Sequence, residues 1–270
     1  LPYTDCSPGF GSVAKYVATS TLEAGLDVKS MAETSTKVFI LEVMGRHAGW
    51  IAAASCLAAS NQGDPPHIIL LPEVPFEKGK FIAQVKQTLK SNGYCVIVAS
   101  EGTKTKAGKF LADSGLTDAF GHKQLGGVAP VISSMISKIG LKNHWAVADY
   151  LQRSARHIAS KTDLDQAYAV GEHAVKLAVA EKTAVMPIIK RISDSPYKWK
   201  IATAPLKNIA NVEKSMPRKF ISKNGFEITS AGRKYLSPLI QGEAPTNFKF
   251  GIPEVASLKK TFVKKKLKEF

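Results

Sequence analysis

The pattern of apolar and polar positions divides the first half of the chain into short strands and longer helices. Apolar runs rich in β-branched residues predict buried strands over residues 38–43, 67–71 and 94–99. Helical periodicity predicts helices over about 7–24, 48–59 and 81–89, the first of them capped by Ser7 and Pro8. Strands and helices that alternate in this way predict right-handed βαβ units, a parallel sheet and an α/β fold.

The second half of the chain is less regular. A further strand is predicted to begin at His144. The residues that follow, through Arg153, would lie at the end of this strand. Residues 162–180 predict a long amphipathic helix, 183–189 a further strand, and 195–205 a hairpin or an irregular segment. Prolines interrupt the tail after residue 211. Apolar residues recur at helical spacing over 258–267 and predict a docked helix with a solvated lysine face.

The stretch from Lys37 to Ala53 contains the clearest candidate for a binding function. Its strand ends at Met44, Gly45 and Arg46, and ligands in open α/β sheets bind outside the carboxyl ends of the strands. A glycine lets backbone N–H groups approach an anion, and an arginine can hold that anion through two hydrogen bonds. From the spacing alone, an ordinary strand-to-helix turn with a solvated arginine is an almost equal alternative.

Other predicted strand ends carry similar chemistry, at Glu73, at Glu101 and from Tyr150 to Arg153. Arginines with backbone amides suit a phosphate, and a carboxylate beside them suits sugar hydroxyls. These residues predict a phosphorylated small molecule in an α/β crevice, but they do not identify a reaction. For Glu73, a helix-start or surface glutamate is an equal alternative.

Composition narrows the choice of partners. The 270 residues carry a net charge of +15, which fits either a nucleic acid or an anionic small substrate. We predict the small substrate and no nucleic acid, because no zinc finger, RNP-like sequence or aromatic-interleaved basic motif is present. No apolar stretch approaches the ~20 residues that span a bilayer, so no membrane contact is predicted. The three widely spaced cysteines predict reduced thiols in a cytoplasmic protein.

Other catalytic and metal-binding motifs are absent from the sequence. It contains no GxSxG, HExxH, CxxC or Walker A pattern. Gly9, Gly11 and Ala14 match GxGxxA, but no strand is predicted before them, so they do not predict a nicotinamide site. We interpret Gly9 and Gly11 as positions of close helix packing or of backbone beside a substrate.

Three motifs together resemble the phosphofructokinase family. LEVMGRHAGWIA, LLPEVPF and YLQRSARHIASKTD follow one another in the order of that family, and the resemblance covers essentially the whole chain. FGHKQLGGVAP, NVEKSMP and PLIQGE resemble the pyrophosphate-dependent branch. The resemblance implies three-layer lobes built on parallel sheets. Residues 16–150 and 213–270 would form a largely complete substrate lobe, and 1–15 and 151–212 the remnant of an N-terminal donor-binding lobe.

The resemblance also implies roles for individual residues. Contacts with the sugar of fructose 6-phosphate are implied for Met44, Gly45, Arg46 and Glu73. The motif that clamps the 6-phosphate has two candidate segments in this chain. We choose the segment that consists of Tyr150, Leu151, Gln152 and Arg153. The rival segment, GHKQLGG, has Leu125 where the clamp needs a guanidinium.

Two further phosphate contacts are implied from a neighbouring subunit, through Lys37 and His144, where many relatives carry arginine. Lysine binds phosphate as a point charge, and a histidine makes the second contact sensitive to pH. A homodimer or homotetramer is therefore expected.

The activity that the resemblance implies is Mg²⁺-dependent transfer of a phosphoryl group from pyrophosphate to the 1-hydroxyl of fructose 6-phosphate, a step of glycolysis. The catalytic aspartate and most ligands of Mg²⁺ and pyrophosphate are expected directly before Leu1. We therefore expect an N-terminally truncated chain with no metal site of its own and negligible turnover alone. Two alternatives stay open: ATP as the donor, and a non-catalytic sugar-phosphate-sensing homologue if the gene begins at Leu1.

Overall fold

Four parallel strands form the central sheet of the computed structural model, which describes residues 1–117, 123–125, 127–262 and 264–265. They run in the order β2-β3-β1-β6 and are β1 (Val38–Val43), β2 (Ile68–Leu70), β3 (Cys95–Ser100) and β6 (Asn143–Val147). In the register, Leu41 of β1 pairs with Val98 on one side and Ala146 on the other. The predicted parallel sheet is confirmed, and the carboxyl end of β1 lies between two other strands.

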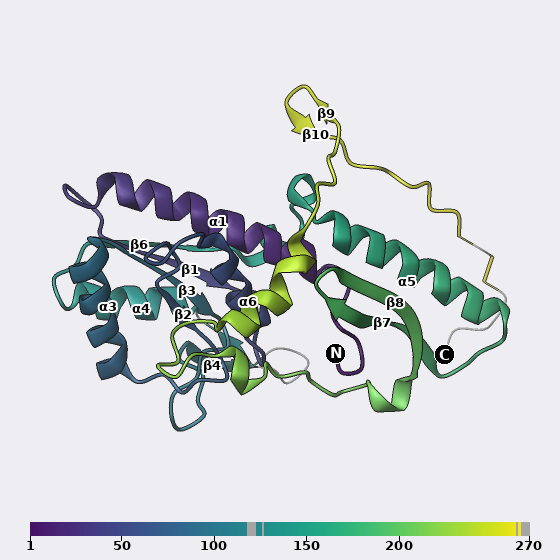
Figure 1. The fold of residues 1–270 in the computed structure, drawn as a ribbon, viewed down its shortest axis with the longest axis horizontal. Coiled ribbons are helices and arrows are strands. Elements are labelled where there is room, and N and C mark those ends of the chain that lie inside the picture. Colours follow the sequence, from purple (N-terminus) through teal and green to yellow (C-terminus); the bar gives the residue numbers. More distant parts are fainter. Residues whose placement is uncertain (118–122, 126, 263, 266–270) are drawn as a thin grey trace.

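Helices cover both faces of this sheet (Figure 1). Successive residues of a strand point to opposite faces, so the strands supply two separate cores. One core lies under α1 (Phe10–Met31) and α2 (Trp50–Ala54) and takes from the strands Leu41, Val43, Ile69 and Val98. The other lies under α3 (Lys78–Asn92) and α4 (Val128–Ser137) and takes Val38, Ile40, Ile68, Leu70 and Ile97. This arrangement confirms the predicted three-layer α/β fold.

A second group of elements lies beside the sheet and consists of one helix on an antiparallel hairpin. The helix α5 (Lys161–Val179) packs against β7 (Val185–Asp194), which pairs with β8 (Tyr197–Pro205). The predicted strand over 183–189 is thus the first part of a longer one. Figure 1 shows α1 extending from the sheet toward this group.

The remaining elements are short. They are the 3-10 helices η1 (Ser55–Ala58), η2 (Asp149–Arg153), η3 (Arg156–Ile158), η4 (Leu206–Asn208), η5 (Arg218–Phe220) and η6 (Ser237–Ile240), the α-helix α6 (Ser230–Leu236), and the strands β4 (Asp113–Thr117), β5 (Lys123–Leu125), β9 (Phe248–Lys249) and β10 (Ile252–Pro253). Among the described residues, none of the helices combines the length and apolar character needed to cross a membrane.

The two-lobe division stays a prediction. Its expected boundary between residues 15 and 16 falls inside α1, which continues without a break from Phe10 to Met31. Close helix packing is found at Gly11, where a Cβ atom would lie 2.3 Å from the carbonyl oxygen of Leu239, but not at Gly9, where a Cβ atom would meet nothing within 4 Å. A lobe boundary between residues 15 and 16 would therefore run through the middle of a continuous helix.

Two predictions about helices need correction. The first helix begins at Phe10 after Gly9, and not at the Ser7–Pro8 pair. The tail helix expected over 258–267 is absent from its described part: residues up to 262 are extended, and the side chains of Leu258 and Phe262 are 85% and 87% exposed. Val263 and residues 266–270 lie outside the described residues. A short amphipathic helix with no surface to bury its apolar face is marginal in water, which explains the difference.

Candidate functional site

The candidate site is the turn of Met44, Gly45 and Arg46, which follows β1 at the edge of the sheet. Gly45 has φ of +135°, a conformation that side chains disfavour. The hydroxyl of Ser100 donates to the carbonyl oxygen of Gly45 at 2.5 Å. Gly102 lies so close to the turn that a Cβ atom there would be 2.1 Å from the carbonyl oxygen of Arg46. The end of β3 therefore fixes the backbone of this turn.

Two polar side chains hold the amide groups of the turn. Glu101 Oε1 accepts a hydrogen bond from Gly45 N at 3.1 Å. Gln152 Oε1 accepts one from Met44 N at 3.4 Å, and Gln152 Nε2 donates to the carbonyl oxygen of Asp149 at 2.8 Å. The side chain of Gln152 is only 2% exposed. The structure thus joins the predicted turn directly to the predicted phosphate clamp.

The other clamp residues lie on η2, directly after β6. The Arg153 guanidinium carbon lies 4.6 Å from the centre of the Tyr150 ring, a cation–π contact. The side chains of Tyr150 and Leu151 are exposed beside it. Of the rival clamp, GHKQLGG, the structure describes residues 123–125, in β5, and Gly127, which directly precedes α4; Gly121, His122 and Gly126 lie outside the described residues, as does Phe120 before them.

Glu73 has structural partners in addition to its predicted role. Its carboxylate accepts hydrogen bonds from Gly49 N at 3.0 and 3.2 Å and from Met216 N at 3.1 Å. Gly49 is the residue before α2, so Glu73 caps the amino end of the helix that follows the turn. A carboxylate has acceptor capacity beyond these bonds. The prediction that Glu73 binds sugar hydroxyls therefore stays a prediction.

The segment 213–216 contacts residues that directly follow the turn. Glu213 Oε1 contacts His47 Nδ1, and the carbonyl oxygen of Lys214 accepts a hydrogen bond from Trp50 Nε1 at 2.7 Å. Between the turn and the first residues of the chain lies a cavity of about 400 Å³. Among the residues that line it are Arg46, His47, Trp50, Lys214, Asp5 and Tyr235.

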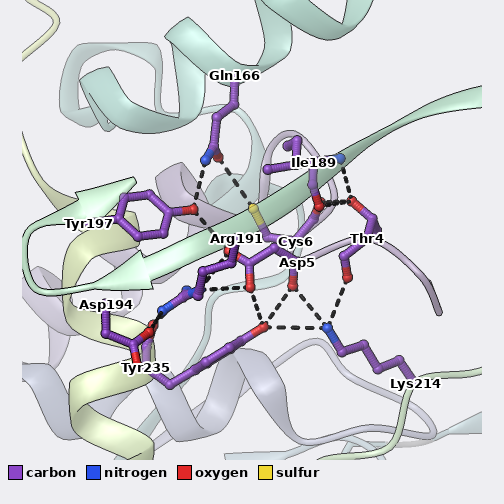
Figure 2. Close-up of polar contacts among 10 residues, drawn as sticks. All are labelled: Thr4, Asp5, Cys6, Gln166, Ile189, Arg191, Asp194, Tyr197, Lys214 and Tyr235. Atoms are coloured by element: carbon purple, nitrogen blue, oxygen red, sulfur yellow. Dashed lines mark hydrogen bonds and ion pairs between the residues drawn. The ribbon is translucent and has the colours of Figure 1, made fainter. Parts of the chain in front are cut away.

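Asp5 is the centre of a polar cluster on the far wall of this cavity (Figure 2). Its carboxylate accepts from Arg191 Nε at 2.9 Å, from the Tyr197 hydroxyl at 2.9 Å and from the Tyr235 hydroxyl at 2.8 Å. We refer to Asp5, Arg191, Tyr197, Tyr235 and Lys214 as the Asp5 cluster. Burial and the nearby Asp5 carboxylate raise the pKa of both tyrosines, so their hydroxyls remain donors.

A buried carboxylate lies behind the turn, on β1 itself. Glu42 Oε2 accepts a hydrogen bond from Ala129 N at 2.8 Å, at the amino end of α4. Burial raises the pKa of Glu42, and the nearby Glu101 and Asp149 carboxylates act in the same direction. Glu42 therefore anchors the amino end of α4.

Lys37 and His144 lie at the opposite end of the sheet. Lys37 directly precedes β1, and His144 pairs with Phe39 in the register of β6 with β1. Both side chains are exposed. At about 3.3 Å per residue, the strand places Lys37 roughly 20 Å from Met44. Neither residue reaches the turn of its own chain, which fits the prediction that they serve a neighbouring subunit.

Sequence reasoning missed the support for the turn. The sequence groups Glu101 with the strand-end carboxylates that suit sugar hydroxyls but does not predict its contact with Gly45; its position after β3, next to β1 in the sheet, is the available signal. The roles of Gln152 and Lys214 depend on contacts 108 and 164 residues apart, which local patterns do not contain. Within the described ranges, no group of three or more His, Cys, Asp or Glu side chains is arranged to hold a metal ion.

Comparisons with known proteins agree with this geometry. A family profile described as Phosphofructokinase matches residues 1–178. The pyrophosphate–fructose 6-phosphate 1-phosphotransferase of Halomonas elongata is 63% identical over 271 residues, which is 100% of this chain and 65% of the relative. The enzyme of that name from Methylococcus capsulatus is 56% identical, over 99% of this chain and 64% of the relative.

A solved structure gives the same result. The pyrophosphate-dependent phosphofructokinase of Marinobacter aquaeolei matches with a TM-score of 0.89 at 56% identity, over 99% of this chain and 64% of that chain. The chain thus spans 64–65% of the length of these curated relatives.

Proposed function

Because the chain belongs to the phosphofructokinase family, we propose that the whole protein transfers a phosphoryl group from pyrophosphate to the 1-hydroxyl of fructose 6-phosphate, giving fructose 1,6-bisphosphate. The names of the most similar relatives support pyrophosphate as the donor. In such a transfer the protein acts mainly by positioning the reactants and neutralising charge.

One observation carries the proposal: the hydrogen bond from Met44 N to Gln152 Oε1. It ties the turn with Arg46 to the segment with Arg153, although the two segments are far apart in the sequence. Two guanidinium groups then serve one site, and guanidinium groups bind phosphate through paired hydrogen bonds. Glu101, held against Gly45, adds a carboxylate that suits sugar hydroxyls.

Each residue of the site has a task in binding the sugar phosphate. Arg153 holds the 6-phosphate, with Tyr150 stacked on its guanidinium to restrict its motion. Met44, Gly45 and Arg46 line the sugar, and their backbone is fixed by Glu101, Ser100 and Gln152. Glu73 either binds a hydroxyl or acts through the start of α2.

A second copy of the chain completes the site with Lys37 and His144. The exposed edge strand β6 supports such an interface, because Trp145 and Val147 are 45% and 41% exposed on it. Leu22 and Leu26 of α1 are exposed as well. Apolar side chains that gather in this way mark surfaces for association. A homodimer or homotetramer is the expected assembly, in the cytoplasm.

Magnesium is proposed from the family alone. The tasks proposed here for the residues of this chain are to bind and orient the acceptor.

The test is a phosphotransferase assay with the purified product of the complete gene, with fructose 6-phosphate as acceptor and pyrophosphate or ATP as donor in separate reactions. We expect turnover with pyrophosphate and little with ATP, and negligible turnover from residues 1–270 alone. Turnover with ATP but not with pyrophosphate would identify ATP as the donor. No turnover with either donor, together with measurable binding of fructose 6-phosphate, would favour a non-catalytic sensor.

A further inference from the structure

We propose that Lys214 is a positioning residue for this reaction: it holds the N-terminal segment, residues 1–6, at a fixed distance from the Arg46 turn. The inference deepens the proposed function and rests on it. Lys214 touches both sides of the cavity between the segment and the turn, and neither the sequence motifs nor the comparisons assign it a role.

The ammonium group of Lys214 forms hydrogen bonds with one wall of the cavity. It donates to the carbonyl oxygens of Thr4 at 2.9 Å and Asp5 at 3.0 Å and to the Tyr235 hydroxyl at 3.3 Å. An ammonium group has three N–H donors and no acceptor, so these three partners use its full capacity. Because the ammonium group is a charged donor, its hydrogen bonds are stronger than those between neutral groups.

The backbone of Lys214 is attached to the other wall. Its carbonyl oxygen accepts from Trp50 Nε1 at 2.7 Å, and Trp50 is the first residue of α2, which follows the turn. The Lys214 ammonium also lies 5.7 Å from the centre of the Trp50 ring. A single residue thus connects the turn that carries Arg46 with the N-terminal segment.

The N-terminal segment is held equally firmly on its other side. The Asp5 side chain is 4% exposed and is bonded to Arg191 of β7 and Tyr197 of β8, and Asp5 N donates to the carbonyl oxygen of Ile189 at 2.8 Å. Figure 2 shows these contacts converging on Asp5, with Lys214 beside them. Because the hairpin anchors the segment, Lys214 sets the separation between the hairpin and the acceptor turn.

The distance between donor and acceptor groups decides the rate of a phosphoryl transfer, since a misplacement of about 1 Å can lower the rate about 100-fold. Lys214 is bonded to backbone carbonyl oxygens and is not placed to grip the 6-phosphate at Arg153. Its loss is therefore expected to lower kcat and to leave substrate affinity nearly unchanged, a pattern that indicates lost transition-state geometry.

The kinetic test uses the product of the complete gene with Lys214→Met, Lys214→Arg and Tyr235→Phe. We expect K214M to lower kcat per folded molecule about 10- to 100-fold, with KM for fructose 6-phosphate within about twofold of wild type. K214R keeps a charged donor and should recover most of the loss. Y235F removes one acceptor of Lys214 and one donor to Asp5, keeps the other two bonds of Lys214, and should lower kcat less than K214M. The control is Lys207→Met, at an exposed site in η4, with no expected change.

A second measurement follows the segment itself by amide hydrogen exchange at Asp5. K214M is expected to accelerate this exchange at least about tenfold over wild type and K207M, and K214R is expected to leave it near wild type. Wild-type kcat in K214M, an increase in KM alone, or unchanged Asp5 exchange would overturn the proposal. If K214M does not fold, wild-type kcat in Y235F would overturn the proposal. A wild-type protein without phosphotransferase activity would instead remove the proposed function, and the exchange rates would still decide whether Lys214 holds the segment.

Discussion

The carboxylate of Asp163 accepts two hydrogen bonds from Ser12, from its backbone amide at 2.9 Å and from its hydroxyl at 2.6 Å. It also accepts from Gly9 N at 2.8 Å. Gly9 has no side chain that could cap α1. Asp163 of α5, which lies 151 residues after Ser12, caps the helix instead. The negative charge lies at the positive end of the α1 dipole.

Replacing Asp163 should therefore be strongly destabilising. Asp163→Ala leaves partly buried amides at the start of α1 without this partner, and we expect the free energy of unfolding to fall by about 1–2 kcal/mol. Urea unfolding measures this change. Asp165→Ala, on the same helix, is the matched control, because Asp165 pairs with Lys161 at an exposed position. It should change stability by less than about 0.5 kcal/mol. Equal effects at the two positions would contradict the capping role.

The clamp prediction is tested by a substitution that keeps the charge. Arg153→Lys preserves the positive charge but removes the planar fork, so we expect KM and Kd for fructose 6-phosphate to rise about 10- to 100-fold. Calorimetry of the product of the complete gene measures Kd. Arg156→Lys is the control, since Arg156 donates to the carbonyl oxygen of Ala244 and lies outside the clamp motif. Unchanged affinity in R153K would favour the GHKQLGG segment as the phosphate clamp.

Glu42 should make stability depend on pH in a characteristic direction. Its pKa is raised above the ordinary value of 4.5, so the folded state binds more protons than the unfolded state between the two pKa values. The free energy of unfolding therefore falls as pH rises through that window. Glu42→Gln removes the ionisable group and keeps an acceptor for Ala129 N. We expect E42Q to gain stability relative to wild type as pH rises above about 4.5.

Unfolding midpoints in urea at a series of pH values between 4 and 8 measure this effect. Glu33→Gln is the control, at an exposed position after α1, and should follow the wild-type profile. Parallel profiles for E42Q and wild type would show that Glu42 does not carry the effect.

The three cysteines should be inert in the folded protein. Cys6, Cys56 and Cys95 are buried and free, and burial raises their pKa, to about 12 for Cys6 and Cys56. Thiols react as thiolates, so a disulfide reagent at pH 8 should label none of them quickly in the native protein and all of them in denaturant. Ser30→Cys, at an exposed position of α1, should react at once and serves as the positive control. Rapid native labelling would refute the prediction.

The sequence was most informative where local pattern and tertiary environment agree. The apolar run over 38–43 coincides with β1, because helices cover both faces of the sheet and the strand needs no polar face. The glycine after it marks a real positive-φ turn at Gly45. The parallel sheet followed from the spacing of the apolar runs, since each crossover needs a helix.

Local pattern was less informative where a distant residue supplies the partner. The sequence predicts Ser7 as the cap of α1, but the helix is capped two residues later, at Gly9, through the carboxylate of Asp163. Glu73 and Glu101 look alike as strand-end carboxylates, and only the order of strands in the sheet puts Glu101 against Gly45. The tail over 258–262 has helical spacing without a surface to bury it.

The Asp5 cluster also sets the order in which the molecule can be completed during synthesis. Tyr235 follows its partner Asp5 by 230 residues in the chain. At 5–20 residues per second, the interval is roughly 10–50 s. Until then the hydrogen bond between Asp5 and Tyr235 cannot form, although the last strand of the central sheet, β6, is made before Tyr235. The period in which the nascent chain is open to aggregation is therefore set by the order of its segments and not by the stability of its finished fold.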